Sequence, residues 1–169
     1  MGQFQSTTFK LNPPTPGVTV TVDFQMLFLL GLNMPVEIST ASAYVAPPLS
    51  TQRRSIQVMA HFDTGCSVTS IDMALASHLQ LVQTGMGIST TANGSATNPN
   101  YAIDIAFINS SLKPIQNLQI SSCRLPFNVT AALTNSKDSR NFGLLIGRDI
   151  MSRWHVTWNG PTSAVFITD

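Results

Sequence analysis

Residues 56–65 read IQVMAHFDTG, and this stretch decides how the chain folds. Its first seven residues form an apolar run with β-branched and aromatic members, the composition of a buried strand. The strand would deliver Asp63, Thr64 and Gly65 to a turn. Far along the chain, residues 142–150 read FGLLIGRDI. An Asp-Thr-Gly tripeptide is common by chance, and it gains weight here from the strand before it and from this second stretch.

A strand ending in Asp-Thr-Gly, followed by a hydrophobic-hydrophobic-Gly segment that leads into Arg-Asp, resembles the retropepsin-like aspartic proteases. The resemblance covers most of the chain beyond Val18 and points to the single-domain bacterial members of the family. It implies a mostly β fold, a closed acid-protease barrel with a flap hairpin and one or two short helices. It also implies an aspartic-type endopeptidase that needs no metal and no organic cofactor.

The resemblance also implies roles for individual residues. Asp63 matches the catalytic aspartate, and Thr64 and Gly65 match the residues that support it in the catalytic loop. Residues 88–107 match the flap that closes over substrate. The other matched positions are the tip of that flap and a segment that supports the loop and the dimer, namely Asn93, Gly94 and Ser95, and Gly147, Arg148 and Asp149.

Aspartic-protease chemistry needs two carboxylates that share a proton, because two like charges about 3 Å apart cannot both ionise. The chain has one Asp-Thr-Gly and no Asp-Ser-Gly. The second carboxylate must then come from another copy of the chain, so we expect a homodimer acting on a peptide or protein. Thr64 would bond across the two-fold axis, while Gly65 would allow close approach of substrate and an unusual φ angle.

Four departures from the family pattern concern the dimer and the substrate more than the fold. Cys66 stands where the family most often has Ala or Ser. Ser67 replaces the aspartate that, in retroviral enzymes, binds an arginine equivalent to Arg148, so the partner of Arg148 stays open. An insertion over residues 35–54 and a long N-terminal arm exceed a minimal viral protease.

Length and composition fit a globular protein. The chain has 169 residues, the size of one domain, and we expect a flexible arm over residues 1–17 and a single domain over residues 18–169. Charged residues make up only 10% of the chain, far below the usual share of about a quarter, which weakly favours an oligomer. The net charge of +1 gives no electrostatic footprint for nucleic acid.

Cysteine usage and hydropathy suggest a cytoplasmic protein. Cys66 and Cys123 form neither a disulfide framework nor a zinc motif, and both fit buried thiols in a reducing compartment. The longest apolar run, residues 24–34, is shorter than the roughly 20 residues that span a bilayer, and it does not resemble a signal peptide. We therefore expect no membrane span.

Local patterns predict the order of elements. Alternating residues favour strands over residues 18–24, 56–62, 115–120 and 125–129, while residues 25–32 could be a short helix or a buried strand. Residues 35–54 are rich in Pro and small polar residues and are expected to form a loop. The remaining elements are a helix over 70–81 with Ser70 as N-cap, a hairpin over 85–107 turning at Asn93-Gly94, a short helix over 148–153 and a closing hairpin over 155–168.

Other functions are compatible with parts of the sequence. Asp63 could simply terminate a strand in a tight turn, and the same fold could serve as a non-catalytic peptide-binding or scaffold domain. A cysteine-dependent hydrolase or redox protein built on Cys66, with His61 or His78 as base, is a third possibility, although a buried thiol is the commoner role. Replacing Asp63 and Cys66 separately would distinguish the three.

Overall fold

The computed structural model describes residues 3–5, 31–44, 53–91, 94–133, 141–159 and 164–169. The strand expected over residues 18–24, most of the undecided segment over 25–32, and Asn93 lie outside the described residues. Of the arm expected over residues 1–17, only Gln3–Gln5 are described, and they form strand β1. The division into an arm and a single domain stays a prediction.

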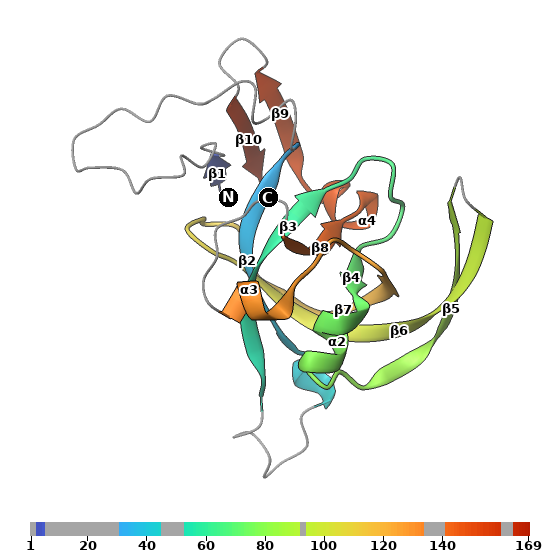
Figure 1. The fold of residues 1–169 in the computed structure, drawn as a ribbon. Helices are drawn as coiled ribbons and strands as arrows, with labels where there is room; N and C mark the ends of the chain where they lie inside the picture. The colour runs from blue at the N-terminus through green and yellow to red at the C-terminus, as the bar shows by residue number, and fades with distance from the viewer. Residues whose placement is uncertain (1–2, 6–30, 45–52, 92–93, 134–140, 160–163) are drawn as a thin grey trace.

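Seven of the described strands form one mixed sheet, and six of them close into a barrel (Figure 1). Around the barrel the order is β2 (Asn33–Thr40), β3 (Ser55–Phe62), β8 (Phe142–Ile146), β4 (Ser70–Asp72), β7 (Ile115–Cys123) and β6 (Gly94–Phe107), which pairs back with β2. The β3–β8 and β4–β7 pairs are parallel, and the others are antiparallel. The expected mostly β, closed barrel with a few short helices is confirmed.

The barrel encloses one apolar core. Because side chains alternate along a strand, every second residue points inward and loses its contact with water. The largest fully buried side chains come from the barrel strands, from two short helices and from the last strand: Met34, Ile38, Ile71, Leu75, Leu79, Ile103, Ile105, Ile120, Leu144, Ile146, Ile150 and Ile167.

The loop expected over residues 35–54 is wrong in its first part, because β2 continues to Thr40. The alternating inward residues are fully buried: Met34, Val36 and Ile38. Pro35 does not prevent the strand, since its carbonyl accepts a hydrogen bond from the Ile108 N–H at 3.1 Å and the ladder to β6 begins only after it. The period-two pattern was present in the sequence but hidden by this proline.

The helix expected over residues 70–81 is too long. Its first three residues form β4, which lies between β8 and β7, and the helix is limited to α2 (Met73–His78). The N-cap is Asp72 rather than Ser70. The Asp72 carboxylate accepts hydrogen bonds from two backbone N–H groups of the first turn, at 2.8 and 3.3 Å.

The strand expected over residues 125–129 is absent, and this segment instead leads into helix α3 (Val129–Leu133). Two side chains turn the backbone away from the sheet. The second carboxylate oxygen of Asp72 accepts a hydrogen bond from the Leu125 N–H at 2.9 Å. Asn128 accepts one from a backbone N–H of the first turn of α3 at 3.0 Å, as an N-cap does.

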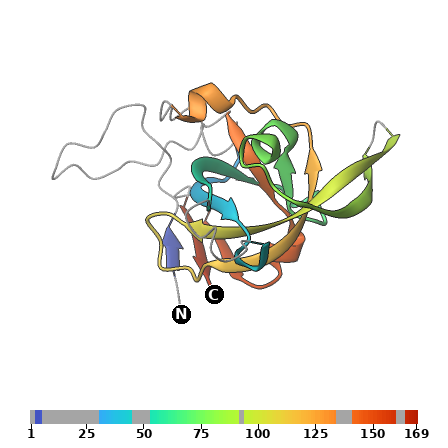
Figure 2. The same ribbon diagram turned by 90° about the horizontal axis from the view of Figure 1, so that it is seen from below.

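The two expected hairpins and the short helix after Gly147 are confirmed. Strand β5 (Gln83–Thr91) pairs with β6, and β9 (His155–Asn159) pairs with β10 (Ala164–Thr168). Helix α4 is shorter than expected and spans Arg148–Met151. Strand β1 lies beside β10 and completes a small antiparallel sheet (Figure 2).

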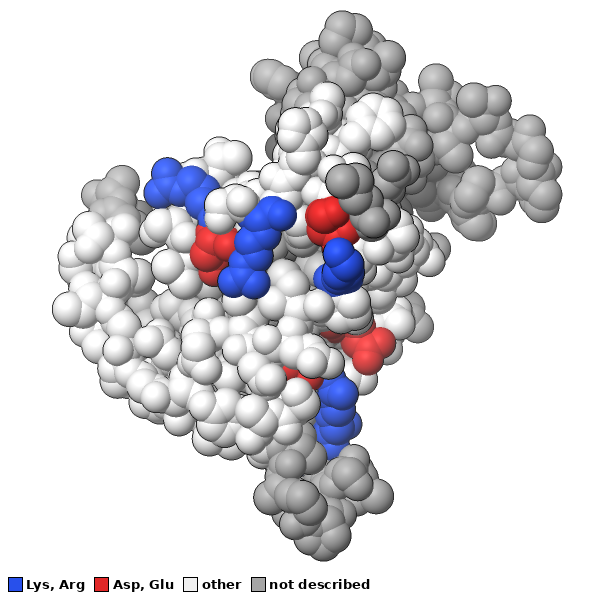
Figure 3. Space-filling model, turned by 180° about the vertical axis from the view of Figure 1, so that it is seen from behind, with Lys and Arg blue, Asp and Glu red and all other residues white. Residues whose placement is uncertain are grey.

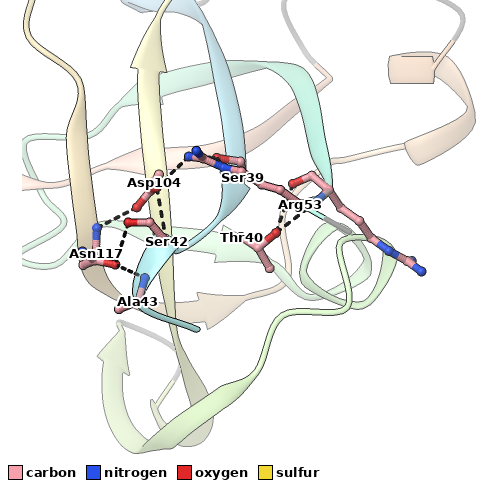
Figure 4. Close-up of polar contacts among 8 residues, drawn as sticks. Ser39, Thr40, Ser42, Ala43, Arg53, Asp104 and Asn117 are labelled. Atoms are coloured by element: carbon pink, nitrogen blue, oxygen red, sulfur yellow. Dashed lines mark hydrogen bonds and ion pairs between the residues drawn. The ribbon is translucent and has the colours of Figure 1, made fainter. Parts of the chain in front are cut away.

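A buried carboxylate helps to close the barrel where β6 returns to β2. Asp104 on β6 accepts hydrogen bonds from the Arg53 guanidinium at 2.6 Å, from the Asn117 N–H at 2.7 Å and from the Ser42 N–H at 3.3 Å (Figure 4). Its side chain is only 6% exposed. Three segments far apart in the sequence are thereby joined, and buried charge of this kind is tolerated only when its hydrogen bonds are satisfied.

Candidate active site

Asp63 is the first residue after β3, at the point where β3 and β8 end side by side. Phe62 is the register partner of Ile146 in the parallel pair. The Asp63 N–H donates to the Ile146 carbonyl at 3.1 Å, and the Asp63 carbonyl accepts from the Cys66 N–H at 3.1 Å. The backbone of Asp63 is therefore fixed on both sides, by the neighbouring strand and by its own tight turn.

The carboxylate of Asp63 is held by one oxygen and leaves the other available. Its Oδ1 atom accepts a hydrogen bond from the Gly65 N–H at 2.8 Å. Within the described part of the chain, no other hydrogen bond to this carboxylate is found. A half-buried carboxylate with one oxygen fixed and one free is oriented for chemistry on a bound group.

Gly65 is needed at this position for a reason that differs in part from the one expected. A Cβ atom there would lie 3.0 Å from Oδ1 of Asp63 and would crowd the carboxylate. The expectation of an unusual φ angle is wrong, since the positive-φ glycines of the described chain are Gly31 and Gly94. Glycine fits at this position because a side chain would crowd the Asp63 carboxylate, and not because the backbone needs an unusual conformation.

Gly147 and Asp149 hold the loop that follows Asp63 in place through contacts with Val68 and Thr69. Asp149 Oδ1 accepts hydrogen bonds from both the N–H of Thr69, at 2.9 Å, and its hydroxyl, at 2.8 Å. The same Thr69 hydroxyl accepts from the Gly147 N–H at 3.1 Å. A Cβ atom on Gly147 would lie 2.6 Å from the carbonyl carbon of Val68. Gly147 thus lets the end of β8 touch the backbone that follows the loop.

Thr69 is a supporting residue that sequence reasoning missed. It is fully buried and joins the segment after Asp63 to Gly147 and Asp149. In the sequence, however, it is a single threonine in a short run of small residues. A threonine without a distinctive neighbour carries no local signal. Only the pairing of distant segments reveals its role.

Arg148 contacts the loop through its backbone rather than its side chain. Its N–H donates to the Cys66 carbonyl at 2.9 Å, while the residue itself is exposed. Its guanidinium makes no ion pair with any residue that the structure describes. The partner of the Arg148 side chain, left open by the sequence, therefore stays open.

The outer surface of this loop, residues 63–68, is open. Thr64, Gly65, Ser67 and Val68 are all exposed, and Val68 exposes 45% of its surface although it is apolar. The hydroxyl of Thr64 has no described partner within the chain. An exposed loop with unpaired polar groups and an apolar residue is suited to contact another protein surface.

His61, two residues before Asp63, is occupied by its own neighbours. Its Nδ1 atom is hydrogen-bonded to the Asn33 side-chain oxygen at 2.9 Å, and its ring stacks on Phe142 with centroids 4.9 Å apart. Burial lowers the pKa of His61, and the charge of Asp63 opposes that shift in part.

Cys66 lacks the arrangement of a catalytic thiol. Its Sγ atom donates to the Val68 carbonyl oxygen at 2.9 Å. No hydrogen bond between Cys66 and a histidine is found among the described residues. Nucleophilic cysteines need an adjacent base, so this geometry does not favour a hydrolase based on Cys66.

The β5–β6 hairpin stands out from the barrel beyond β4 and α2 (Figure 1). Gly94 and Ser95, two of the three expected tip residues, are exposed, and Gly94 has a φ of +114°. Bonds between the two strands dominate near the tip, for instance Thr90 Oγ1 to Ser95 Oγ at 3.0 Å. The described tip is thus held mainly by its own strands.

Comparison with known proteins gives likenesses of structure only. No protein-family model matches the sequence, and no curated protein matches it. Among solved structures, the chain is similar to a retropepsin-like aspartic protease from Rickettsia conorii, with 11% identity, a TM-score of 0.43, and coverage of 80% of this chain and 88% of that one. It is also similar to a foamy viral protease-reverse transcriptase in complex with an RNA/DNA hybrid, with 13% identity and a TM-score of 0.42.

The second likeness spans 73% of this chain but only 12% of the viral chain. Likenesses this weak leave the activity of the present chain open. What can be inferred about its chemistry rests on its own residues, above all on the setting of Asp63.

Other kinds of site are less well supported by the described residues. Within them, no group of three or more His, Cys, Asp or Glu side chains is arranged to hold a metal ion. No described helix is long and apolar enough to cross a membrane. On the face shown in Figure 3, Lys and Arg side chains are interspersed with Asp and Glu, and uncharged residues cover most of the surface.

Proposed function

We propose that this chain is an aspartic endopeptidase that works as a homodimer, with one Asp63 from each subunit forming the catalytic dyad. One observation carries the proposal. The Asp63 carboxylate lies at the end of a barrel strand, with one oxygen bonded to the Gly65 N–H at 2.8 Å and the other free of described partners.

The chemistry follows from pairing two such carboxylates. Brought close together, they share one proton, because the second ionisation is opposed by the first charge. The ionised member takes a proton from a bound water as that water attacks the scissile carbonyl carbon, while the protonated member donates to the carbonyl oxygen. Collapse of the tetrahedral intermediate then breaks the C–N bond, and the amine leaves with a proton. We expect activity to be greatest at acidic to mildly acidic pH.

The exposed side of the loop supplies the contact that such a dimer needs. One carboxylate per chain requires a two-fold arrangement in which the same surface meets itself. Thr64 is exposed and would bond to the loop of the partner subunit. Beneath it, Gly147, Arg148 and Asp149 hold the loop through the backbone and through Thr69.

The β5–β6 hairpin would act as the flap over a bound peptide, with Asn93, Gly94 and Ser95 at its tip. Its described tip residues are exposed, which leaves them free to move onto substrate. No metal and no organic cofactor enters this mechanism. The substrate would be a peptide or protein segment in extended conformation, bound between the flap and the two loops.

Replacement of Asp63 by Asn tests the catalytic role. Asp63→Asn should abolish peptide cleavage while the circular dichroism spectrum and elution volume stay unchanged. Glu37→Gln removes a carboxylate on β2 and is the matched control, expected to keep full activity. Cleavage that persists in Asp63→Asn and is lost in Cys66→Ala would exclude the aspartic mechanism.

Subunit mixing tests the dimer. Adding Asp63→Asn subunits in excess to a fixed amount of wild type should suppress cleavage, because mixed dimers hold only one competent carboxylate. Specific activity should also rise with protein concentration through the dissociation range. A monomer in sedimentation that cleaves peptide at a concentration-independent specific rate would refute the homodimer.

A further inference from the structure

The two cysteines of the chain, distant in sequence, lie on neighbouring segments beside the loop that follows Asp63. Cys66 Sγ donates to the Val68 carbonyl oxygen at 2.9 Å, and the Ser70 hydroxyl donates to that same oxygen at 3.2 Å. The Ser70 side chain also acts on the Cys123 thiol, whose pKa it lowers in part. Both thiols are free and partly buried. Ser70 thus shares an acceptor with Cys66 and lies on the strand that pairs with the strand of Cys123.

Sheet register explains how Cys123 reaches this place. Strand β4 pairs in parallel with β7, with Ser70 opposite Ser121 and Asp72 opposite Cys123. Because paired side chains in a sheet share a face and alternate along each strand, Ser70, Asp72 and Cys123 project on one side. The turn after Asp63 then returns the chain toward the start of β4 and brings Cys66 to the same carbonyl.

The two thiols differ in the ways that a redox pair requires. Burial, followed by the charges at Cys66 and Asp72, raises the pKa of Cys123 to about 11, so Cys123 stays protonated at neutral pH and does not react first. Cys66 lies between Gly65 and Ser67, which are both exposed. Because both thiols are half-buried, the order in which they react follows from the raised pKa of Cys123 rather than from exposure.

We propose that Cys66 and Cys123 are a regulatory redox pair, whose oxidation to a disulfide by a peroxide displaces the catalytic loop. The sulfur of Cys66 attacks one oxygen of hydrogen peroxide, the O–O bond breaks, and one water leaves with Cys66 as a sulfenic acid. The sulfur of Cys123 then displaces the hydroxyl group as a second water. Two thiols and one peroxide give one disulfide and two waters, and a dithiol reductant reverses the change.

Bond formation would disturb the loop because Cys66 anchors it twice. Its N–H donates to the Asp63 carbonyl, and its carbonyl accepts from the Arg148 N–H. A sulfur–sulfur bond of about 2.05 Å requires Cys66 to leave the Val68 carbonyl and move toward β7. Asp63 would move with it. That effect on cleavage rests on the proposed function, whereas formation of the disulfide does not.

Intact mass and peptide mapping after stepwise addition of hydrogen peroxide test the proposal. We expect the loss of two hydrogens per chain, a Cys66–Cys123 crosslink in the unreduced digest, and loss of cleavage in parallel, all reversed by dithiothreitol. In Cys123→Ser, the reduced protein should cleave normally. After peroxide, its Cys66 should be trapped by dimedone as a sulfenic acid without a crosslink.

The outcomes separate this proposal from the catalytic one. A crosslink between chains, or no crosslink before methionine oxidation begins, overturns the redox pair. A crosslink within the chain that leaves cleavage unchanged overturns its regulatory role. If the reduced wild type does not cleave peptides at all, the proposed function fails, and the mass and the unfolding temperature of the oxidised protein still decide whether the crosslink forms and shifts the loop.

Discussion

At the scale of single residues, Asp63 and His61 are coupled at the end of β3. Burial removes water from around an imidazolium and lowers the pKa of His61, while the carboxylate of Asp63 raises it by a smaller amount. The folded protein therefore binds fewer protons at His61 than the unfolded chain does, below the ordinary pKa of 6.5. By linkage, this site contributes stability that is present above that pH and is lost as pH falls through the lowered pKa.

His61→Gln should remove this part of the acid sensitivity. We expect the free energy of unfolding of wild type to fall more steeply from pH 7.5 to pH 5 than that of His61→Gln, which cannot be protonated there. Urea denaturation at several pH values measures the difference, with the exposed His78→Gln as control. Equal slopes in wild type and His61→Gln would contradict the assignment. The imidazole signals should also show a further lowered His61 pKa in Asp63→Asn.

Gly147 is the residue whose replacement should damage the loop most directly. In Gly147→Ala, the new Cβ would lie 2.6 Å from the Val68 carbonyl carbon and 2.8 Å from the Thr69 nitrogen. Both are backbone atoms that cannot rotate away, so we expect a loss of about 1–3 kcal/mol in the free energy of unfolding, as for other overpacked sites, with lower activity. Gly85→Ala, where a Cβ would meet nothing within 4 Å, is the matched control and should change little.

At the scale of elements, the outer part of the β5–β6 hairpin has little support from the rest of the described fold. Residues 94–97 are exposed, and Ile88 on the opposite strand exposes 78% of its surface. Elements with few buried contacts open at low free energy, and moving parts of binding sites are commonly drawn from them.

Gly94→Val should therefore affect turnover more than stability. The φ of +114° strains any β-branched residue, although a Cβ there would meet nothing within 4 Å. We expect a clear reduction in kcat with only a small change in Tm, compared with Thr97→Val on the same strand. Equal losses of turnover and stability, or no loss of either, would identify the hairpin as an ordinary surface element.

Elements specified by their own residues could be predicted from the sequence. Strand β3, the β5–β6 hairpin and α4 are each marked by a local sequence signal, either an apolar run or a glycine at the turn or helix start. The structure confirms all three elements. Strand β4 could not be found this way, because its residues read as a helix start until β8 and β7 lie on either side. The same holds within the site, where Asp63 has a motif but Thr69 gains its role only from contacts with Gly147 and Asp149.

At the scale of the whole molecule, the buried Asp104 network decides how firmly the barrel closes. Asp104→Ala would leave the Asn117 and Ser42 N–H groups and the Arg53 guanidinium without their acceptor. We expect a loss of roughly 2–4 kcal/mol, below the upper range for buried pairs because Arg53 is partly exposed. Urea denaturation measures it. Asp104→Asn, which keeps one acceptor oxygen, should lose less, and a larger loss in Asn than in Ala would contradict this account.

The parallel pairing of β3 with β8 has a consequence for the order in which a ribosome makes this chain. Asp63 is synthesised early, but the groups that hold its loop, from the Ile146 carbonyl to the Asp149 carboxylate, come much later. Contacts this distant in sequence form slowly and only after the later segment has emerged. A nascent chain therefore carries Asp63 in an unassembled loop until residue 149 has left the exit tunnel, and translation sets the earliest moment at which this loop can take its folded form.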